Sequence, residues 1–196
     1  FGKGTALDGV SFDIYSGEVT ALLGDNGAGK STFISLVSGV APPSEGQILL
    51  DGEPQQFANP MQARDRGIAT VFQNLSLIED RSIADNLFLG AELLRFGFLL
   101  DRPRMRREAE AVLARLKVNL PPVTTPVRYL SGGQRQAVAV ARTIVRGSRI
   151  VIMDEPTAAL GVRETGKVLD LIRQLRAERT AVLLVSHNMD NIFDVA

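Results

Sequence analysis

The strongest structural signal in this chain is the segment VTALLGDNGAGKST, residues 19–32. It opens with an apolar run, Val19–Leu23, of the kind that forms a buried parallel strand. The residues that follow fit the pattern G-x-x-x-x-G-K-[ST], which binds phosphate where it joins a strand to a helix. We therefore predict a strand, then a phosphate-binding loop, then a helix over Ser31–Ser38. A glycine-rich turn without a ligand is the alternative, and the matching flanks disfavour it.

The residue types in this loop explain the chemistry. Glycines let the backbone wrap around a phosphate with its N–H groups pointing inward. The helix start adds the positive end of its dipole. Lys30 brings a full charge to the β- and γ-phosphates, and Ser31 offers a hydroxyl to Mg²⁺. We expect ATP and Mg²⁺ as ligands. The predicted nucleotide contacts of this loop are Gly24, Asp25, Asn26, Gly27, Ala28, Gly29, Lys30, Ser31 and Thr32.

Further apolar runs alternate with helical patterns along the chain. Ile150–Met153 and Ala181–Val185 suit buried strands, and Gln47–Leu50 and Ile68–Phe72 are weaker candidates. Val162–Ala177 places its apolar residues on one face and predicts a helix. Strands that alternate with helices indicate an α/β fold with a mostly parallel sheet.

The middle of the chain has a different pattern, without a strong strand signal between residues 76 and 146. Helices are expected at Ile83–Arg95, Pro103–Leu116 and Gln134–Arg146. We predict a single domain over residues 1–196, with a core from 1–75 and 147–196 and an inserted helical subdomain from 76–146. The chain begins on Phe1 and stops inside a helix expected from Met189, so we expect it to be cut at both ends.

Composition excludes several classes of protein. Lys plus Arg and Asp plus Glu both number 22, which argues against a protein that coats nucleic acid. The absence of cysteine excludes disulfides, thiolate catalysis and cysteine-bound zinc. No apolar run approaches the ~18 residues of a transmembrane helix. A role at a membrane would therefore require docking on a protein that spans it.

Two carboxylates, Asp154 and Glu155, end the apolar run that starts at Ile150. In a P-loop fold, the strand beside the phosphate loop delivers an Asp to the magnesium shell, and we expect this strand to have that place. Asp154 would then serve the magnesium shell, and Glu155 would orient and deprotonate a water in line with the γ-phosphate. Alone, the pair could simply cap a loop before Pro156. Next to a phosphate loop, catalysis is the better interpretation.

A second glycine-rich helix start reads LSGGQ, residues 130–134. Ser131 can cap the helix, and the two glycines leave its first-turn N–H groups open to an anion. The motif LSGGQ, together with the loop and the acidic pair in this order, closely resembles the nucleotide-binding domains of ABC ATPases across nearly the whole chain. The resemblance implies a P-loop NTPase (RecA-like) core with an antiparallel β part near the N-terminus. It also implies that Ser131, Gly132, Gly133 and Gln134 contact ATP held by a second such domain in a head-to-tail dimer.

The resemblance assigns three further positions. Gln73 matches a glutamine that touches Mg²⁺ or the attacking water and couples to the membrane subunit. His187, the only histidine, matches a residue that senses the γ-phosphate, and a neutral imidazole can donate one hydrogen bond to it. Phe1 matches an aromatic that stacks on adenine. The implied catalytic residues are Glu155, His187, Lys30 and Gln73, and the implied metal ligands are Ser31, Gln73 and Asp154.

One departure from the family pattern concerns the segment AALG, residues 158–161. Most members have Asp where Gly161 stands, in a loop that crosses the dimer interface. The AALG form and the segment Asn86–Gly90 resemble ATPases of bacterial monosaccharide importers. The implied function is ATP-driven sugar import from the cytoplasmic face of the bacterial inner membrane. The implied partners are permease subunits and, indirectly, a periplasmic solute-binding protein, with no nucleic acid.

Three alternatives remain open from the sequence. A soluble ABC ATPase acting on ribosomes or DNA would carry tandem domains or long insertions, which are not visible here. A regulatory module without hydrolysis is disfavoured by the intact Lys30, Asp154, Glu155 and His187. The four arginines of Arg102–Arg107 indicate a solvated helix start, with a docking surface for acidic groups as the alternative.

Overall fold

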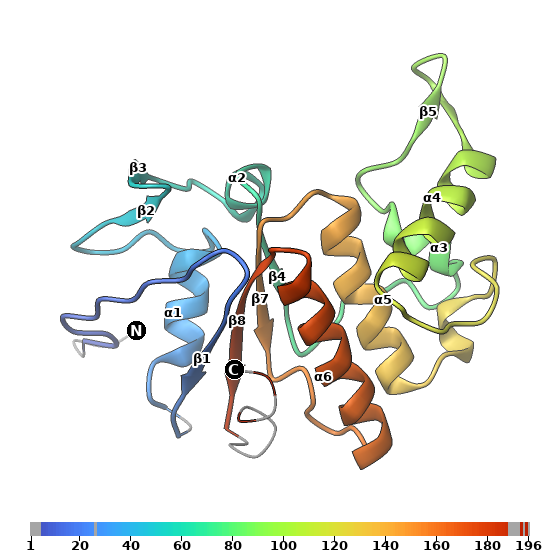
Figure 1. The fold of residues 1–196 in the computed structure, drawn as a ribbon. Helices are drawn as coiled ribbons and strands as arrows, with labels where there is room; N and C mark the ends of the chain where they lie inside the picture. The colour runs from blue at the N-terminus through green and yellow to red at the C-terminus, as the bar shows by residue number, and fades with distance from the viewer. Residues whose placement is uncertain (1–4, 26, 188–192, 194, 196) are drawn as a thin grey trace.

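The computed structural model describes residues 5–25, 27–187, 193 and 195. Its main sheet has four parallel strands in the order β1 (Val19–Leu23), β8 (Ala181–Ser186), β7 (Ile150–Asp154) and β4 (Ile68–Val71). The strands match the predicted apolar runs to within one residue at each end. Strand β8 lies between β1 and β7, so the strand that ends in Asp154 is not a direct neighbour of the strand before the phosphate loop (Figure 1). Periodicity along one strand carries no information about its neighbour in the sheet.

Helices cover both faces of this sheet (Figure 1). On one face, Ile152 and Leu183 belong to the apolar cluster that contains Ile34; the helices there are α1 (Lys30–Val37) and α2 (Pro60–Asp65). On the other face lie α6 (Val162–Ala177) and α5 (Gly132–Val145). Alternate strand residues point to opposite faces, which explains why the strands are apolar throughout.

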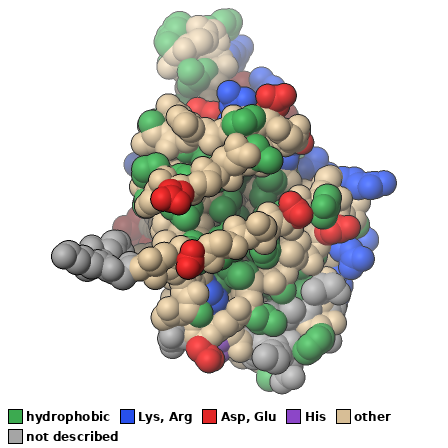
Figure 2. Space-filling model, turned by 90° about the vertical axis from the view of Figure 1, so that its left-hand side faces the viewer, with side chains coloured by type: hydrophobic (Ala, Val, Ile, Leu, Met, Phe, Trp, Pro, Cys, Tyr) green, Lys and Arg blue, Asp and Glu red, His purple; other side chains and the backbone are tan. Residues whose placement is uncertain are grey.

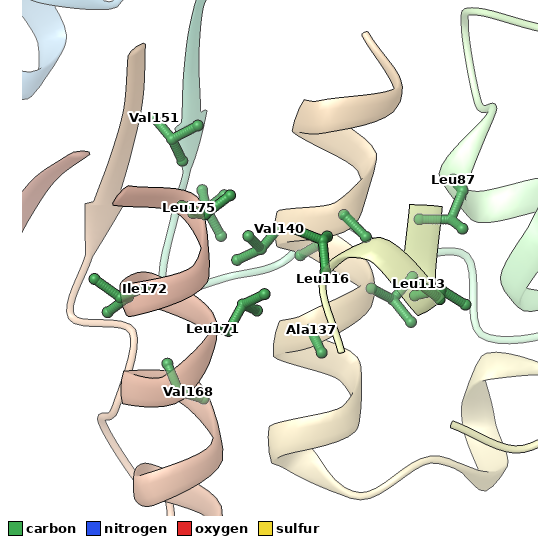
Figure 3. Packing of buried hydrophobic residues seen from close by; sticks show 14 of the residues in the cluster. Leu87, Leu113, Leu116, Ala137, Val140, Val151, Val168, Leu171, Ile172 and Leu175 are labelled. Carbon is green, nitrogen blue, oxygen red and sulfur yellow. The ribbon is translucent and has the colours of Figure 1, made fainter. Parts of the chain in front are cut away.

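The second apolar cluster extends from the sheet through α6 and α5 into the helices beyond (Figure 3). Val151 of β7 meets Leu175 and its neighbours on α6, and Val140 of α5 lies between α6 and Leu116. The order of layers is therefore sheet, α6, α5 and then α3 (Ile83–Leu87) and α4 (Arg102–Arg115). A short 3₁₀ helix at Val127–Tyr129 precedes α5.

The helix expected at Ile83–Arg95 was wrong. Helix α3 ends at Leu87, and the chain then forms a hairpin from β5 (Leu94–Arg95) and β6 (Leu99–Leu100). The loop between them has three residues, Phe96–Phe98, and Phe96 and Gly97 have positive φ. The leucines occur at helical spacing and therefore predicted a helix. The strands of the hairpin are too short to show an alternation of apolar and polar residues.

A second hairpin provides the antiparallel part that was expected near the N-terminus. It pairs β2 (Ile48–Leu50) with β3 (Glu53–Gln55) through Asp51 and Gly52, which both have positive φ. Strand β3 was not predicted, because it is polar and contains Pro54. Among the described residues, no helix has the length and apolar character needed to cross a membrane.

Candidate active site at the carboxyl edge of the sheet

The carboxyl ends of parallel strands lie along one edge of the sheet, and the candidate residues lie at or directly after these strand ends. Register places Leu23 beside Ser186, Asp154 beside Val185 and Val71 beside Met153. The loop after β1, His187 after β8 and the acidic pair at β7 are thus brought to one edge. Gln73, two residues beyond β4, reaches the same edge and is exposed. This is the region where ligands bind in open α/β sheets.

The phosphate loop is held by its glycines and by Lys30. A Cβ at Gly29, which has φ +88, would lie 2.7 Å from the carbonyl oxygen of Ala6 and 2.8 Å from Leu7 Cδ2. Lys30 Nζ donates to the carbonyl oxygens of Gly24, at 2.5 Å, and Asp25, at 2.9 Å. Its ammonium group therefore lies across the loop.

Helix α1 begins without a side-chain cap, because its N-cap is Gly29. The first-turn N–H groups of a helix have no carbonyl partner within the helix. Those of Lys30, Ser31 and Thr32 are therefore available to an anion in the loop. Of the predicted nucleotide contacts, Asn26 and Phe1 lie outside the described residues.

Glu155 is held by two residues at the end of β8. His187 Nδ1 lies 2.8 Å from Glu155 Oε1, and Ser186 Oγ donates to Oε2 at 3.5 Å. The Glu155 side chain is 18% exposed, against 65% for His187. Glu155 also has φ 50, a conformation that costs about 1–3 kcal/mol in a non-glycine residue and persists where surrounding contacts enforce it. Its N–H donates to the carbonyl oxygen of Val185 at 2.9 Å.

The electrostatic environment of Asp154 differs from that of a surface carboxyl. Burial raises its pKa, the negative charge of Glu155 raises it further, and the positive charge of Lys30 acts in the opposite direction. The carboxylate of Asp154 and the hydroxyl of Ser31 are hard oxygen donors of the kind that Mg²⁺ prefers. The residues present therefore fit a magnesium nucleotide.

The LSGGQ segment forms a strongly capped helix start. Ser131 Oγ accepts from Gln134 N at 3.4 Å, and Gln134 Oε1 accepts from Ser131 N at 3.0 Å, which makes a capping box. A Cβ at Gly132 would lie 2.9 Å from Leu160 Cδ2, and one at Gly133 would lie 3.1 Å from Glu164 Cβ. Both glycines thus also serve packing within the chain.

Ser131, Gly132, Gly133 and Gln134 do not meet the phosphate loop of their own chain. They open α5, which lies beyond α6, whereas the loop opens α1 on the opposite face of the sheet (Figure 1). The structure thus brings together the loop, the acidic pair and His187, and separates them from the LSGGQ segment.

Arg142 of α5 is a functional candidate that sequence reasoning missed. Its guanidinium donates to the carbonyl oxygens of Leu75, at 2.9 Å, and Ser76, at 3.0 Å, directly after Gln73. Burial lowers the pKa of this guanidinium, and the neighbouring Arg146 adds to the effect. The one available signal was a charged residue within the apolar helical run 137–145.

Gly161, where an Asp was expected by resemblance, is the N-cap of α6 and provides no side-chain cap. The loop before it connects Glu155 to Leu160 through hydrogen bonds from Ala158 N to Glu155 O and from Leu160 N to Thr157 O. The catalytic candidate Glu155 is thus linked along a short, hydrogen-bonded turn to the residue that packs on Gly132.

Residues 7–158 match the ABC transporter family. The chain belongs to this family. This ABC domain is 50% identical to the fructose import ATP-binding protein FrcA of Rhizobium meliloti, over 100% of the chain and 78% of that protein. It is 44% identical to the ribose import ATP-binding protein RbsA of Rhodopirellula baltica, over 97% of the chain but only 37% of that protein.

Solved structures confirm the P-loop NTPase fold of this ABC domain. CbiO1 of Clostridium perfringens, part of an ABC transporter complex, superposes with a TM-score of 0.81 at 31% identity, over 95% of this chain and 74% of that one. The ATP-binding cassette MJ0796 superposes with a TM-score of 0.78 at 25% identity, over 97% and 83%. The latter structure is a dimer in a post-hydrolysis state that holds ADP and phosphate.

Proposed function

We propose that this chain binds and hydrolyses ATP as the motor subunit of a sugar importer. The observation that carries the proposal is the Glu155–His187 contact of 2.8 Å at the edge that also holds the phosphate loop. It supplies an oriented carboxylate where an attacking water would need a base. Relatives named for fructose and ribose import support the sugar assignment.

The nucleotide is held by the loop and by the start of α1. Backbone N–H groups from Gly27 to Thr32 surround the phosphates, and Lys30 leaves its loop carbonyls to pair with the β- and γ-phosphates. Ser31, Asp154 and Gln73 supply the oxygen ligands of Mg²⁺. When bound, the ion would neutralise the charge that develops on the phosphates.

Glu155 acts as the general base, and His187 is its positioning partner. In a neutral imidazole one nitrogen donates and the other accepts. If Nδ1 donates to the Glu155 carboxylate, Nε2 of the neutral ring is an acceptor and cannot donate to the γ-phosphate. His187 in this contact therefore serves Glu155, and it donates to phosphate only after it leaves Glu155 or gains a proton.

The complete site needs two chains. The LSGGQ segment faces the same edge as the loop but lies across the sheet and α6 from it, so a head-to-tail partner supplies it. The two chains of this dimer dock on permease subunits at the cytoplasmic face of the membrane, through a groove between the helices of the helical subdomain and the Gln73 region. A solute-binding protein contacts the assembly only through the permease, and nucleic acid has no part in it.

Enzyme kinetics of the purified chain test the hydrolysis step. Glu155→Gln keeps the side-chain shape and removes the base, so kcat should fall by about 10²–10⁴-fold while ATP binding persists. Lys30→Ala is the matched control, because it should abolish binding itself. Hydrolysis undiminished in Glu155→Gln would contradict the assignment of the base.

Growth of cells tests the transport step. Cells without this chain should fail to grow on one monosaccharide, such as fructose or ribose, as sole carbon source. The wild-type chain should restore growth and Lys30→Ala should not. Normal growth of the deletion strain on every monosaccharide would contradict sugar import while leaving the ATPase assignment intact.

A further inference from the structure

The β5–β6 hairpin exposes a concentrated apolar surface outside the ATP site. Leu94, Phe96, Phe98, Leu99 and Leu100 are between 48% and 75% exposed. Figure 1 shows the hairpin projecting away from the helices, and Figure 2 shows apolar side chains gathered at this extremity. Contiguous exposed apolar surface of this kind marks an interaction site in a soluble domain. The two phenylalanines flank Gly97 at the tip, so nothing in the hairpin itself can cover them.

The hairpin carries positive charge at its base. Residues 93–107 contain the five arginines Arg95, Arg102, Arg104, Arg106 and Arg107, against the single carboxylate of Asp101. Asp101 is engaged as the cap of α4, where it accepts from Arg104 N at 3.0 Å. All five arginines are exposed. The segment is therefore both apolar and strongly basic, although the whole chain carries no net charge.

The arginines are arranged so that much of this charge is available. Arg102 pairs with Asp85 at 3.6 Å, and Arg104 pairs with Glu108 at 3.7 Å. Within the described part of the chain, Arg95 and Arg107 have no carboxylate partner. The Arg95 guanidinium lies 5.0 Å from the centre of the Phe96 ring, so cation and aromatic face are presented together at the tip.

We propose that the β5–β6 hairpin is an anchor for an anionic lipid surface, a role that goes beyond ATP hydrolysis. The leucine and phenylalanine side chains enter the boundary between headgroups and acyl chains, and the arginines contact the lipid phosphates. Segments that bind in a membrane interface combine phenylalanine and leucine with basic residues such as arginine. The five exposed arginines complement the negative charge of lipid phosphates. An uncharged apolar partner would gain nothing from them, so an anionic lipid surface is the better fit.

Vesicle flotation of the full chain without nucleotide tests the anchor independently of the ATP site. The probes are phosphatidylcholine vesicles with and without phosphatidylglycerol. The wild-type chain should float with the anionic vesicles and at least fivefold less with the neutral ones. Phe96→Ser with Phe98→Ser should reduce anionic flotation at least fivefold, as should Arg95→Glu with Arg107→Glu.

Matched controls change exposed residues elsewhere in the chain. Leu49→Ser with Met61→Ser removes exposed apolar side chains of β2 and α2. Arg163→Glu with Lys167→Glu reverses exposed charges of α6. Both control variants should float like wild type. Circular dichroism and ATPase activity should be unchanged in the phenylalanine variant, because the hairpin tip contacts neither the core nor the site.

Three results would overturn the proposal. The first is equal flotation of the wild-type chain and the phenylalanine variant. The second is absence of wild-type flotation while the phenylalanine variant loses binding to the permease in detergent, which would assign the hairpin to a protein surface. The third is self-association that the phenylalanine variant abolishes, which would assign it to a second copy of this chain.

Discussion

His187 Nδ1 lies 2.8 Å from Glu155 Oε1, which connects the residue after β8 to the residue after β7. Two adjacent parallel strands thus end in a base and the group that orients it. The contact fixes the orientation of the Glu155 carboxylate. Preorganisation of this kind lowers the cost of reaching the transition state.

His187→Ala should show whether His187 orients the Glu155 carboxylate or binds ATP. Without the imidazole, the Glu155 carboxylate keeps the long Ser186 contact of 3.5 Å among the described residues, and kcat should fall by about 10²-fold. The dissociation constant for ATP should change by less than about threefold, because the loop and Lys30 are untouched. Steady-state kinetics with a nucleotide-binding titration measure both. An equal loss in kcat and in ATP affinity would assign His187 to binding.

Asp154→Asn should stabilise the empty chain and abolish its response to magnesium. The pKa of Asp154 is raised above its ordinary 3.8, so its protonated form favours the fold. Its contribution to stability is present below pH 3.8 and is lost as pH rises through the folded pKa. At pH 7 the Asn variant should therefore melt about one or two degrees higher without ligand, yet gain nothing from Mg·ATP over ATP alone.

Asp170→Asn is the control for this prediction, because the Asp170 side chain is 75% exposed in a surface ion pair. It should leave both the melting temperature and the magnesium response nearly unchanged. A lower melting temperature for Asp154→Asn at pH 7 would show that the carboxylate stabilises the empty fold.

Comparison of Gly29→Ala with Gly27→Ala separates the effect of a steric clash from the effect of backbone conformation. Both glycines have φ +88, but a Cβ at Gly29 meets the Ala6 carbonyl at 2.7 Å, whereas one at Gly27 meets nothing within 4 Å. Each variant loses about 1–2 kcal/mol of unfolding free energy to the left-handed backbone. Only Gly29→Ala must also displace the loop. Its affinity for ATP should therefore be more than tenfold lower than that of Gly27→Ala. Equal losses would mean that backbone conformation alone matters.

Arg142→Gln should loosen the segment after Gln73. It removes a partly buried guanidinium that donates to two carbonyl oxygens, those of Leu75 and Ser76. The expected loss is about 1–3 kcal/mol of unfolding free energy, measured by urea denaturation. Arg173→Gln, which breaks an exposed ion pair with Asp170, should cost less than about 1 kcal/mol. Comparable losses would indicate that the two carbonyls find other donors.

The strands and the phosphate loop could be predicted because their signals are local. An apolar run such as Ile150–Met153 and a fixed loop pattern need no partner to be recognised. Strand order, the Glu155–His187 contact and the Arg142 bonds depend on how distant segments meet, which periodicity does not encode. The β5–β6 hairpin was missed for a different reason, since its two-residue strands and clustered leucines imitate a helix.

In the proposed dimer, one chain holds ATP on its phosphate loop and a second chain supplies the LSGGQ segment. The most direct measurement is light scattering after size exclusion on Glu155→Gln, with and without Mg·ATP. This variant should be a monomer alone and a dimer with Mg·ATP, while Glu155→Gln combined with Gly132→Asp should bind ATP and remain a monomer, because its carboxylate repels the partner's phosphates. A monomer of Glu155→Gln at saturating Mg·ATP, or unimpaired dimerisation of the double variant, would contradict the shared site.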